Sequence, residues 1–259
     1  MDKIDIVLLS WNESDITLRC LTSMKEFTTQ PYKIIWIDNG SEHNEYTTVN
    51  NKLKELNIDF ESIALRENYL ISKAWNIGLR TSKSPYVVLL NNDVTFTGRW
   101  LSKLIEILEA NPDIGLISPV TDNISCPARW PRLARALKLK VEGSPAEYFN
   151  SRPSGFLAGG FLVSFFCVVI RKTVIDKIGL ICEELPVGGN DDDYCDRVRE
   201  AGFKTAIAQN CFVYHVHRAT IKNIPESIMA EVRSKRGILL ERRHKRAQKA
   251  IARSAIIEK

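Results

Sequence analysis

The chain has 259 residues, enough to bury a full hydrophobic core as one large α/β domain or two small ones. Its hydrophobic content of 44% and charged content of 26% are ordinary for a soluble globular protein. The formal net charge is +5, and the excess lies in residues 222–259, which hold eleven Lys or Arg and four Glu. The rest of the chain is therefore close to neutral.

The sequence predicts neither a leader nor a membrane span. Met1-Asp2-Lys3 leads directly into a strand-like run, so we expect no signal peptide. The longest apolar run, residues 155–170, is interrupted by Gly and Ser and is too short to cross a bilayer. The six cysteines show no CxxC spacing, which favours reduced thiols. We expect a cytoplasmic protein and leave open a peripheral contact with the inner face of the membrane.

Strand and helix patterns alternate over the first 120 residues. Apolar runs predict strands at 4–9, 32–37, 60–65, 86–90 and 114–119, and amphipathic patterns predict helices at 15–27, 47–56, 72–82 and 100–110. This alternation predicts βα units and a mainly parallel sheet flanked by helices. Neither GxGxxG nor GxxxxGK[ST] occurs, so we expect no dinucleotide fingerprint and no P-loop.

Three of the predicted strands end in short polar turns, at Asn12, at Asp38-Asn39 and at Asn91-Asn92-Asp93. Open α/β sheets bind ligands in the crevice beyond the carboxyl ends of their strands. A carboxylate at that edge suits a hard divalent cation and the phosphates that the cation neutralises. Asn and Asp also favour turns for local reasons, so one such motif alone could be only a turn. Three of them on one edge predict a shared ligand crevice.

The pattern is less regular after residue 120. Residues 121–154 carry prolines, a basic patch and a possible surface helix at 131–139. A long irregular segment can serve as a lid or a substrate-selecting insertion, and a solvated surface helix explains the basic patch equally well. Beyond it, apolar patterns predict a buried strand over 161–170, a helix over 172–178 and a strand over 204–216.

Two groups in the second half of the chain bear chemistry. Asp191-Asp192-Asp193 opens a helix, where a single carboxylate would suffice as a cap. A carboxylate here could instead act as general base towards a hydroxyl nucleophile, while Asp193 could pair with Arg197 one turn further on. His215 and His217 lie on the same face of the last strand, and imidazole plus carboxylate suits Mn²⁺ as well as Mg²⁺.

The order of these motifs resembles the family-2 glycosyltransferases, inverting enzymes of the GT-A fold, and in particular bacterial rhamnosyltransferase-like members. The resemblance covers residues 4–220 and is carried by six short motifs, Val7-Leu8-Leu9-Ser10-Trp11-Asn12, Ile37-Asp38-Asn39-Gly40-Ser41, residues 67–78, Leu89-Leu90-Asn91-Asn92-Asp93, residues 191–197 and His215. Two positions depart from the family pattern, since Asn190 replaces an acid and Tyr69 replaces a glycine. The implied fold is α/β, with a Rossmann-like, mainly parallel central sheet and a C-terminal helical tail.

The resemblance implies transfer of a sugar from a UDP-, dTDP- or GDP-linked donor to a glycan, lipid-linked or protein acceptor, in cell-surface polysaccharide or glycoconjugate synthesis. It implies Mn²⁺ or Mg²⁺ on Asp93, with His215 or His217 as a further ligand. The implied catalytic base is Asp191, with Asp193 as the alternative. The implied donor-binding residues are Ser10, Asn12, Asp38, Asn39, Lys73, Asn76, Asn91 and Asn92.

Two other functions stay open. A nucleotidyltransferase also uses strand-end carboxylates and Mg²⁺, although the glycine-rich basic loop expected near residue 10 does not occur. An inactive protein that only binds nucleotide-sugars is favoured by Asn190 alone.

We expect a glycosyltransferase domain at residues 1–220, with a nucleotide-sugar-binding half at 1–120 and an acceptor or catalytic half at 121–220. A basic helical tail would follow at 221–259. The tail could lie on an anionic membrane near a lipid-linked acceptor, pack against another subunit, or be a solvated helix. It lacks aromatic residues, so we expect no nucleic-acid binding.

Overall fold

The computed structural model describes residues 3–124, 127–160, 162–216, 223–235 and 237–245. The strands are β1 (Ile4–Ser10), β2 (Tyr32–Asp38), β3 (Phe60–Ala64), β4 (Tyr86–Asn91), β5 (Val94–Phe96), β6 (Ile114–Thr121), β7 (Phe156–Gly159), β8 (Cys167–Arg171) and β9 (Lys204–His215). The helices are α1 (Ser14–Phe27), α2 (His43–Glu55), α3 (Leu70–Thr81), α4 (Trp100–Ala110), α5 (Trp130–Ala136), α6 (Pro145–Asn150), α7 (Lys172–Ile178), α8 (Asn190–Glu200) and α9 (Glu226–Ser234). Residues 237–245 are also α-helical and follow α9.

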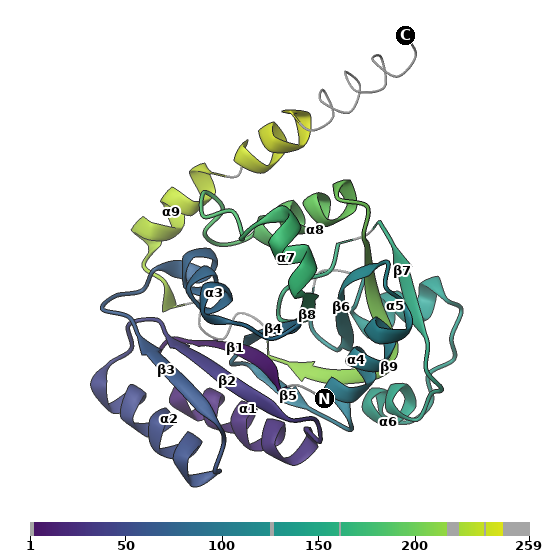
Figure 1. The fold of residues 1–259 in the computed structure, drawn as a ribbon, viewed down its shortest axis with the longest axis horizontal. Helices are drawn as coiled ribbons and strands as arrows, with labels where there is room; N and C mark the ends of the chain where they lie inside the picture. Colours follow the sequence, from purple (N-terminus) through teal and green to yellow (C-terminus); the bar gives the residue numbers. More distant parts are fainter. Residues whose placement is uncertain (1–2, 125–126, 161, 217–222, 236, 246–259) are drawn as a thin grey trace.

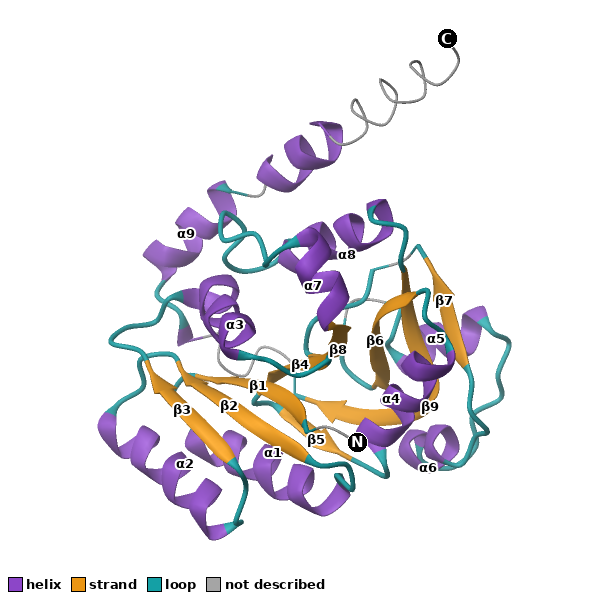
Figure 2. Cartoon of the chain, viewed as in Figure 1, coloured by secondary structure: helices purple, strands orange, loops and turns teal. Residues whose placement is uncertain are grey.

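These strands form one sheet in the order β3-β2-β1-β4-β8-β6-β9-β5, with β7 paired to β9 (Figure 1). Helices cover both faces of the sheet, with α1 and α2 on one side of the first three strands and α3 on the other (Figure 2). The predicted α/β architecture is confirmed. The C-terminal helices project from one end of the molecule, beyond α3 and α8 (Figure 1).

The first half of the sheet, β3-β2-β1-β4, is parallel as predicted. β1 is buried along its whole length and β4 along most of it, because helices cover both faces; this is why both strands read as continuous apolar runs. The approach of α3 to β1 is close. A Cβ added at Gly78 would lie 2.2 Å from Cγ1 of Val7, so this helix packs directly on the strand.

The second half of the sheet is mixed, and every antiparallel pair of strands in the described part of the chain involves it. β8 is antiparallel to β4 and β6, and β9 is parallel to β6 but antiparallel to β5 and β7. A parallel neighbour needs a crossover of a dozen or so residues. Only Asn92 and Asp93 separate β4 from β5, so β5 leaves the parallel half and pairs Val94 with His215 of β9.

Other elements differ from the prediction in extent. The strand expected over 161–170 is restricted to β8, and residues 162–166 are irregular although Phe165 and Phe166 are buried. The helix expected at 131–139 is α5, whose Leu133 and Ala134 are buried, so it is more than a solvated surface helix. The sequence did not predict β5, β7 or α6.

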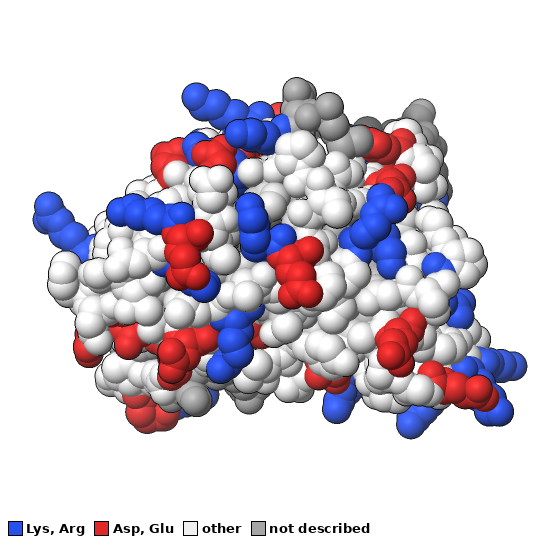
Figure 3. Space-filling view, turned by 90° about the horizontal axis from the view of Figure 1, so that it is seen from below, with Lys and Arg blue, Asp and Glu red and all other residues white. Residues whose placement is uncertain are grey.

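None of the helices in the described part of the chain is long and apolar enough to cross a membrane. Figure 3 shows Lys and Arg interspersed with Asp and Glu on one face of the molecule, so that face carries mixed charge. The proposed division at residues 120 and 220 stays a prediction.

Candidate active site

The three polar turns lie at one edge of the sheet, as expected. The register pairs Ser10 with Asp38 and Leu9 with Asn91, so the ends of β1, β2 and β4 are adjacent. A small cavity of about 50 Å³ lies there. Its lining combines the three turns with the start of α3 and the residues before it, and with one residue before α9: Leu9, Ser10, Trp11, Asn39, Asn68, Leu70, Ile71, Asn91, Asn92, Asp93 and Ile224.

The turn after β1 is tied to the turn after β2. Asn12 adopts a positive φ of 49°, its backbone N–H donates to Ser41 Oγ at 2.7 Å, and its side-chain oxygen accepts from the Glu42 N–H at 2.9 Å. Ser10 Oγ accepts a hydrogen bond from the indole N–H of Trp36 at 2.8 Å. Ser10 and Asn12, which the sequence predicts to bind the nucleotide-sugar donor, therefore shape this edge of the sheet through local hydrogen bonds.

Asp38 is 3% exposed, and its Oδ2 accepts from the Ser41 N–H at 3.1 Å. Burial raises the pKa of Asp38, and the hydrogen bonds from Ser41 oppose that rise. Its Oδ1 has no hydrogen-bond partner within the described residues. Since a buried carboxylate oxygen is costly to leave unsatisfied, this atom suits a ligand N–H or O–H.

Asn39 organises the loop that leads into α3. Its side-chain N–H group donates to Asn68 Oδ1 at 2.8 Å, and its Oδ1 accepts from the Tyr69 N–H at 2.9 Å. These bonds hold Leu70 at a positive φ of 61°, where the helix begins. Asn68 lies in the motif at residues 67–78, but the sequence did not predict it to be a site residue.

Two residues of α3 that are predicted to bind the nucleotide-sugar donor do not line the small cavity. Lys73 Nζ lies 3.8 Å from the centre of the Tyr69 ring, a cation–π contact at the surface. Asn76 is 1% exposed, donates to the Ile181 carbonyl at 2.9 Å and accepts from the Ile181 N–H at 2.9 Å. The structure therefore does not bring Asn76 to the cavity; Asn76 fixes the loop after α7.

The turn after β4 delivers Asp93 to His215. Asp93 Oδ1 lies 3.2 Å from His215 Nε2, and the two residues are 6% and 3% exposed. Asn92 faces the other way, since its side chain donates to Thr17 Oγ1 at 2.9 Å. Asn91 lines both the small cavity and a larger one. His217 lies outside the described residues.

The orientation of His215 is informative. Its Nδ1 lies 2.9 Å from the Asn123 carbonyl oxygen, so Nδ1 must be the donor in that bond. The ring stacks on Phe166 with centroids 4.9 Å apart. Nε2 of a neutral ring would then direct a lone pair at the carboxylate of Asp93, so a proton or a metal ion is needed between them. A carbonyl that fixes the ring in this way is typical of metal-binding histidines.

The donor set fits a divalent cation. Two ligands at about 2.1 Å from an octahedral ion and at right angles to each other lie about 3 Å apart, close to the observed separation of Asp93 and His215. Within the described residues no group of three or more His, Cys, Asp or Glu is arranged so that it could hold a metal ion. Mg²⁺ commonly takes water and phosphate oxygens as its further ligands.

A larger cavity of about 810 Å³ adjoins this pair. Asn91, His215, Asp191 and Asp192 all contribute to its lining. Much of its wall is apolar or aromatic, contributed by Ile71, Trp75, Ile124, Leu162, Phe165, Phe166, Leu185, Pro186 and Val187. The wall of this cavity thus includes the predicted metal ligand His215 and the predicted base Asp191.

Asp191 is held at the first turn of α8. Its Oδ2 accepts from Ser164 Oγ at 3.1 Å, and its Oδ1 accepts from the Asp192 N–H at 3.0 Å. Burial, and then the charge of Asp192, raise the pKa of Asp191 to about 6, while the bond from Ser164 opposes the rise. A carboxylate with such a pKa is ionised at neutral pH and is a stronger base than an ordinary aspartate.

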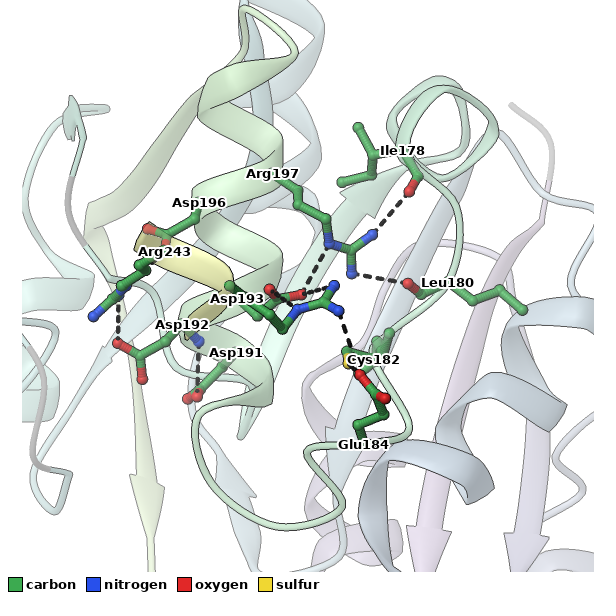
Figure 4. A network of polar contacts seen from close by, with 12 residues as sticks. Ile178, Leu180, Cys182, Glu184, Asp191, Asp192, Asp193, Asp196, Arg197 and Arg243 are labelled. Atoms are coloured by element: carbon green, nitrogen blue, oxygen red, sulfur yellow. Dashed lines mark hydrogen bonds and ion pairs between the residues drawn. The ribbon is translucent and has the colours of Figure 1, made fainter. Parts of the chain in front are cut away.

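Asp193, the alternative base, is fully buried. Its Oδ2 accepts from Arg197 Nε at 3.0 Å and its Oδ1 accepts from Arg242 Nε at 2.8 Å. Figure 4 shows Asp193 directed towards Arg197, with Asp191 and Asp192 pointing elsewhere. The pairing of Asp193 with Arg197, expected from their spacing, is confirmed.

Sequence reasoning missed Ser164 and Arg242. Ser164 lies in the run that was predicted to be a continuous buried strand, and the polar residue within that run was the available signal. Arg242 lies 49 residues from Asp193, so no local pattern could have indicated their contact.

Comparison with known proteins identifies the family. The model of glycosyl transferase family 2 matches residues 5–179. The chain is a family 2 glycosyl transferase. This confirms the predicted family, whereas the likeness to rhamnosyltransferase-like members stays a prediction.

Two curated relatives are informative. Chondroitin synthase of Pasteurella multocida is 35% identical over 240 residues, which cover 82% of this glycosyl transferase and 24% of that protein. Teichoic acid poly(glycerol phosphate) polymerase of Staphylococcus epidermidis is 26% identical over 152 residues, covering 59% and 20%. This chain therefore spans about a quarter or less of the length of these relatives.

Solved structures confirm the GT-A fold. A mannosyltransferase from Pyrobaculum calidifontis, in complex with GDP-Man and Mn²⁺, superposes with a TM-score of 0.65 at 15% identity, over 84% of this chain and 58% of that one. GalNAc-T7 with UDP, GalNAc and Mn²⁺ superposes with a TM-score of 0.66 at 17% identity, over 84% and 44%.

Proposed function

We propose that this glycosyl transferase moves a sugar from a nucleotide-sugar donor to an acceptor hydroxyl, with inversion at the anomeric carbon. The observation that carries the proposal is that His215, the partner of Asp93, and Asp191 both line the larger cavity. Such a cavity can hold a leaving diphosphate and an attacking hydroxyl at the same time.

The strand ends of the parallel half would seat the nucleoside diphosphate. The unsatisfied Oδ1 of Asp38 can accept a hydrogen bond from the base or ribose. Asn91 lies between the small cavity and the large one, where the diphosphate would pass. Lys73 would reach a phosphate only by leaving the Tyr69 ring.

Asp93 and His215 would hold Mn²⁺ or Mg²⁺, which when bound neutralises charge on the leaving diphosphate. The chain's own contribution is to orient these two ligands. The Asn123 carbonyl fixes the proton on His215 Nδ1, and the Asp122 carboxylate accepts the His215 backbone N–H at 3.0 Å. His217 remains a candidate ligand by sequence.

Asp191 would take the proton from the acceptor hydroxyl as that oxygen attacks the sugar. It faces the large cavity, it is ionised at neutral pH, and Ser164 holds its carboxylate in place. Attack from the side opposite the diphosphate gives inversion. The burial of Asp193 between two arginines favours Asp191 over Asp193 for this role.

The named relatives favour polysaccharide synthesis, because one makes chondroitin and another makes poly(glycerol phosphate). The neighbours that contain UDP or GDP-Man favour a UDP- or GDP-linked donor, and dTDP-sugars remain to be tested. A cytoplasmic site of action is part of the proposal.

The contacts of Asn190 support the enzyme over an inactive binding protein. Its amide donates to Ser72 Oγ at 3.1 Å, and it therefore joins α8 to α3 rather than substituting for the base.

The test is a transfer assay with UDP-, dTDP- and GDP-sugars in the presence of Mn²⁺. Acceptors are chondroitin oligosaccharides and poly(glycerol phosphate), and the anomeric configuration of the product is read by NMR. We expect Asp191→Asn to lower kcat by about 10³-fold, typical for loss of a general base, with nucleotide affinity unchanged. Asp113→Asn, which alters only an exposed pair with Lys204, is the matched control. Full turnover by Asp191→Asn would refute the assignment of the base.

A further inference from the structure

The C-terminal segment, defined as α9 and residues 237–245, contributes a wall of the large cavity. Met229, Val232 and Leu239 supply apolar surface there, and Arg233 and Lys235 supply the charged part. Val232 is 8% exposed although α9 lies at the periphery of the fold. The segment therefore packs against the site instead of extending freely into solvent along its whole length.

Arg242 anchors the segment to α8. Its Nε donates to Asp193 Oδ1 at 2.8 Å, and its Nη1 lies 3.5 Å from Glu184 Oε2. Because the Asp193 side chain has no solvent exposure, this pair is shielded from water on the carboxylate side. Such a pair is strongly coupled to the packing around it.

Arg243 makes a second anchor on the same helix. Its Nε donates to Asp196 Oδ2 at 2.7 Å and its Nη2 donates to Asp192 Oδ1 at 3.0 Å. Figure 4 shows Arg243 lying against Asp192 and Asp196 on the side of α8 away from Arg197. Arg242 and Arg243 therefore form ion pairs on two sides of α8.

The four aspartates of α8 have different partners. Arg242 and Arg243 bind Asp193, Asp192 and Asp196, whereas Asp191 bonds to Ser164 and lines the cavity. Leu239 packs beside the turn before α8, where a Cβ added to Gly189 would lie 3.3 Å from Leu239 Cδ2. The segment therefore contacts both the start of this helix and its acidic face.

We propose that the C-terminal segment is part of the acceptor site and that Arg242 and Arg243 are positioning residues that hold it there. The two arginines hold the wall formed by Met229, Val232 and Leu239 beside Asp191. The acceptor is thereby oriented against this wall and against Asp191. This inference rests on the proposed transfer to a hydroxyl acceptor. It assigns to the basic tail a role inside the reaction instead of on a membrane.

The experiment compares Arg242→Gln, Arg243→Gln and the double variant with the wild type, in the full chain. Donor and acceptor are the pair that gives transfer in the assay above. Lys245→Gln is the matched control, since Lys245 pairs with Glu241 of its own helix. Arg242→Lys tests rescue by charge. Leu239→Ala alters the wall without touching an ion pair, which covers the case that an arginine variant does not fold.

We expect the double variant to raise the acceptor KM at least about tenfold, with the donor KM and the hydrolysis of donor by water unchanged. Leu239→Ala should raise the acceptor KM less, and Arg242→Lys should restore part of the loss. Hydrogen exchange of residues 226–245 should become faster in the double variant and stay unchanged in Lys245→Gln.

Two outcomes would overturn the inference alone. If the wild type transfers sugar and the double variant and Leu239→Ala both keep its acceptor KM, the segment is not part of the acceptor site. If turnover rises when the anchors are removed, the segment obstructs the cavity. If the wild type transfers no sugar to any acceptor, the proposed function fails and the inference fails with it.

Discussion

The two halves of the sheet stabilise their parts of the site by different means. In the parallel half, hydrogen bonds of short polar side chains such as Asn12 and Asn39 hold neighbouring turns together. In the mixed half, ion pairs from Arg197, Arg242 and Arg243 hold the helix that carries Asp191. The proposed donor side is therefore held by hydrogen bonds between neighbouring turns, and the proposed acceptor side by charges that distant segments bring together.

This difference matters because the two kinds of contact respond differently to change. A turn at the end of a buried strand is fixed by the strand itself. A buried ion pair depends on both partners, and loss of one leaves the other charge uncompensated. Changes in the mixed half should therefore affect stability most, and changes in the parallel half should affect nucleotide binding most.

The largest expected effect is that of Asp193→Ala. Loss of this buried carboxylate leaves Arg197 and Arg242 without their shared partner, and we expect a decrease of about 3 kcal/mol in the unfolding free energy. Urea denaturation would measure it. Nucleotide affinity of the folded protein should stay unchanged, because the donor side belongs to the other half.

Asp113→Ala, at an exposed pair, is the control and should unfold like the wild type. Normal stability of Asp193→Ala combined with lost transfer would instead make Asp193 catalytic.

The next effect is that of Asp93→Ala, which removes the proposed metal ligand that the parallel half presents to His215 of the mixed half. We expect nucleotide affinity in the presence of Mn²⁺ to fall by about 100-fold, and affinity in EDTA to stay the same. Calorimetric titration with UDP or GDP measures both values. Asp59→Ala, which alters an exposed pair with Lys3, is the control. Equal affinity of Asp93→Ala and the wild type in Mn²⁺ would place the ion elsewhere.

The smallest effect concerns the charge of Asp191. Its pKa is raised by burial and by Asp192 from 3.8 to about 6, so the folded protein binds this proton more tightly than the unfolded chain. The stabilisation is complete below pH 3.8 and is lost as the pH rises through about 6. The Asp191→Asn variant lacks this titration, so its unfolding free energy relative to that of the wild type should be higher at pH 7.5 than at pH 4.5. We expect this increase to be about 1–2 kcal/mol, because the cavity partly solvates the carboxylate.

Thermal or urea unfolding of Asp191→Asn at both pH values tests this prediction, and kcat/KM of the wild type should fall tenfold per pH unit well below pH 6. A pH-independent difference in stability would show that Asp191 is not the group whose pKa is raised.

The sequence by itself determined the parallel half. The alternation of apolar runs and amphipathic segments predicted β1 to β4 and their helices, because a strand covered on both faces must be apolar throughout. It also placed Asp38, Asn91 and Asp93 at one edge, since parallel strands end on the same side. The pairing of Asp193 with Arg197 followed from helical spacing alone.

Only the tertiary structure decided the rest. Residues two positions apart on a helix point about 200° apart, and the packing of α8 decided that Asp191 faces the cavity and Asp193 faces the arginines. The two-residue link between β4 and β5 let β5 pair antiparallel with β9, which brought His215 to Asp93. Arg242 reaches Asp193 across 49 residues of sequence. Contacts of that range depend on how the whole chain packs, and no local pattern contains them.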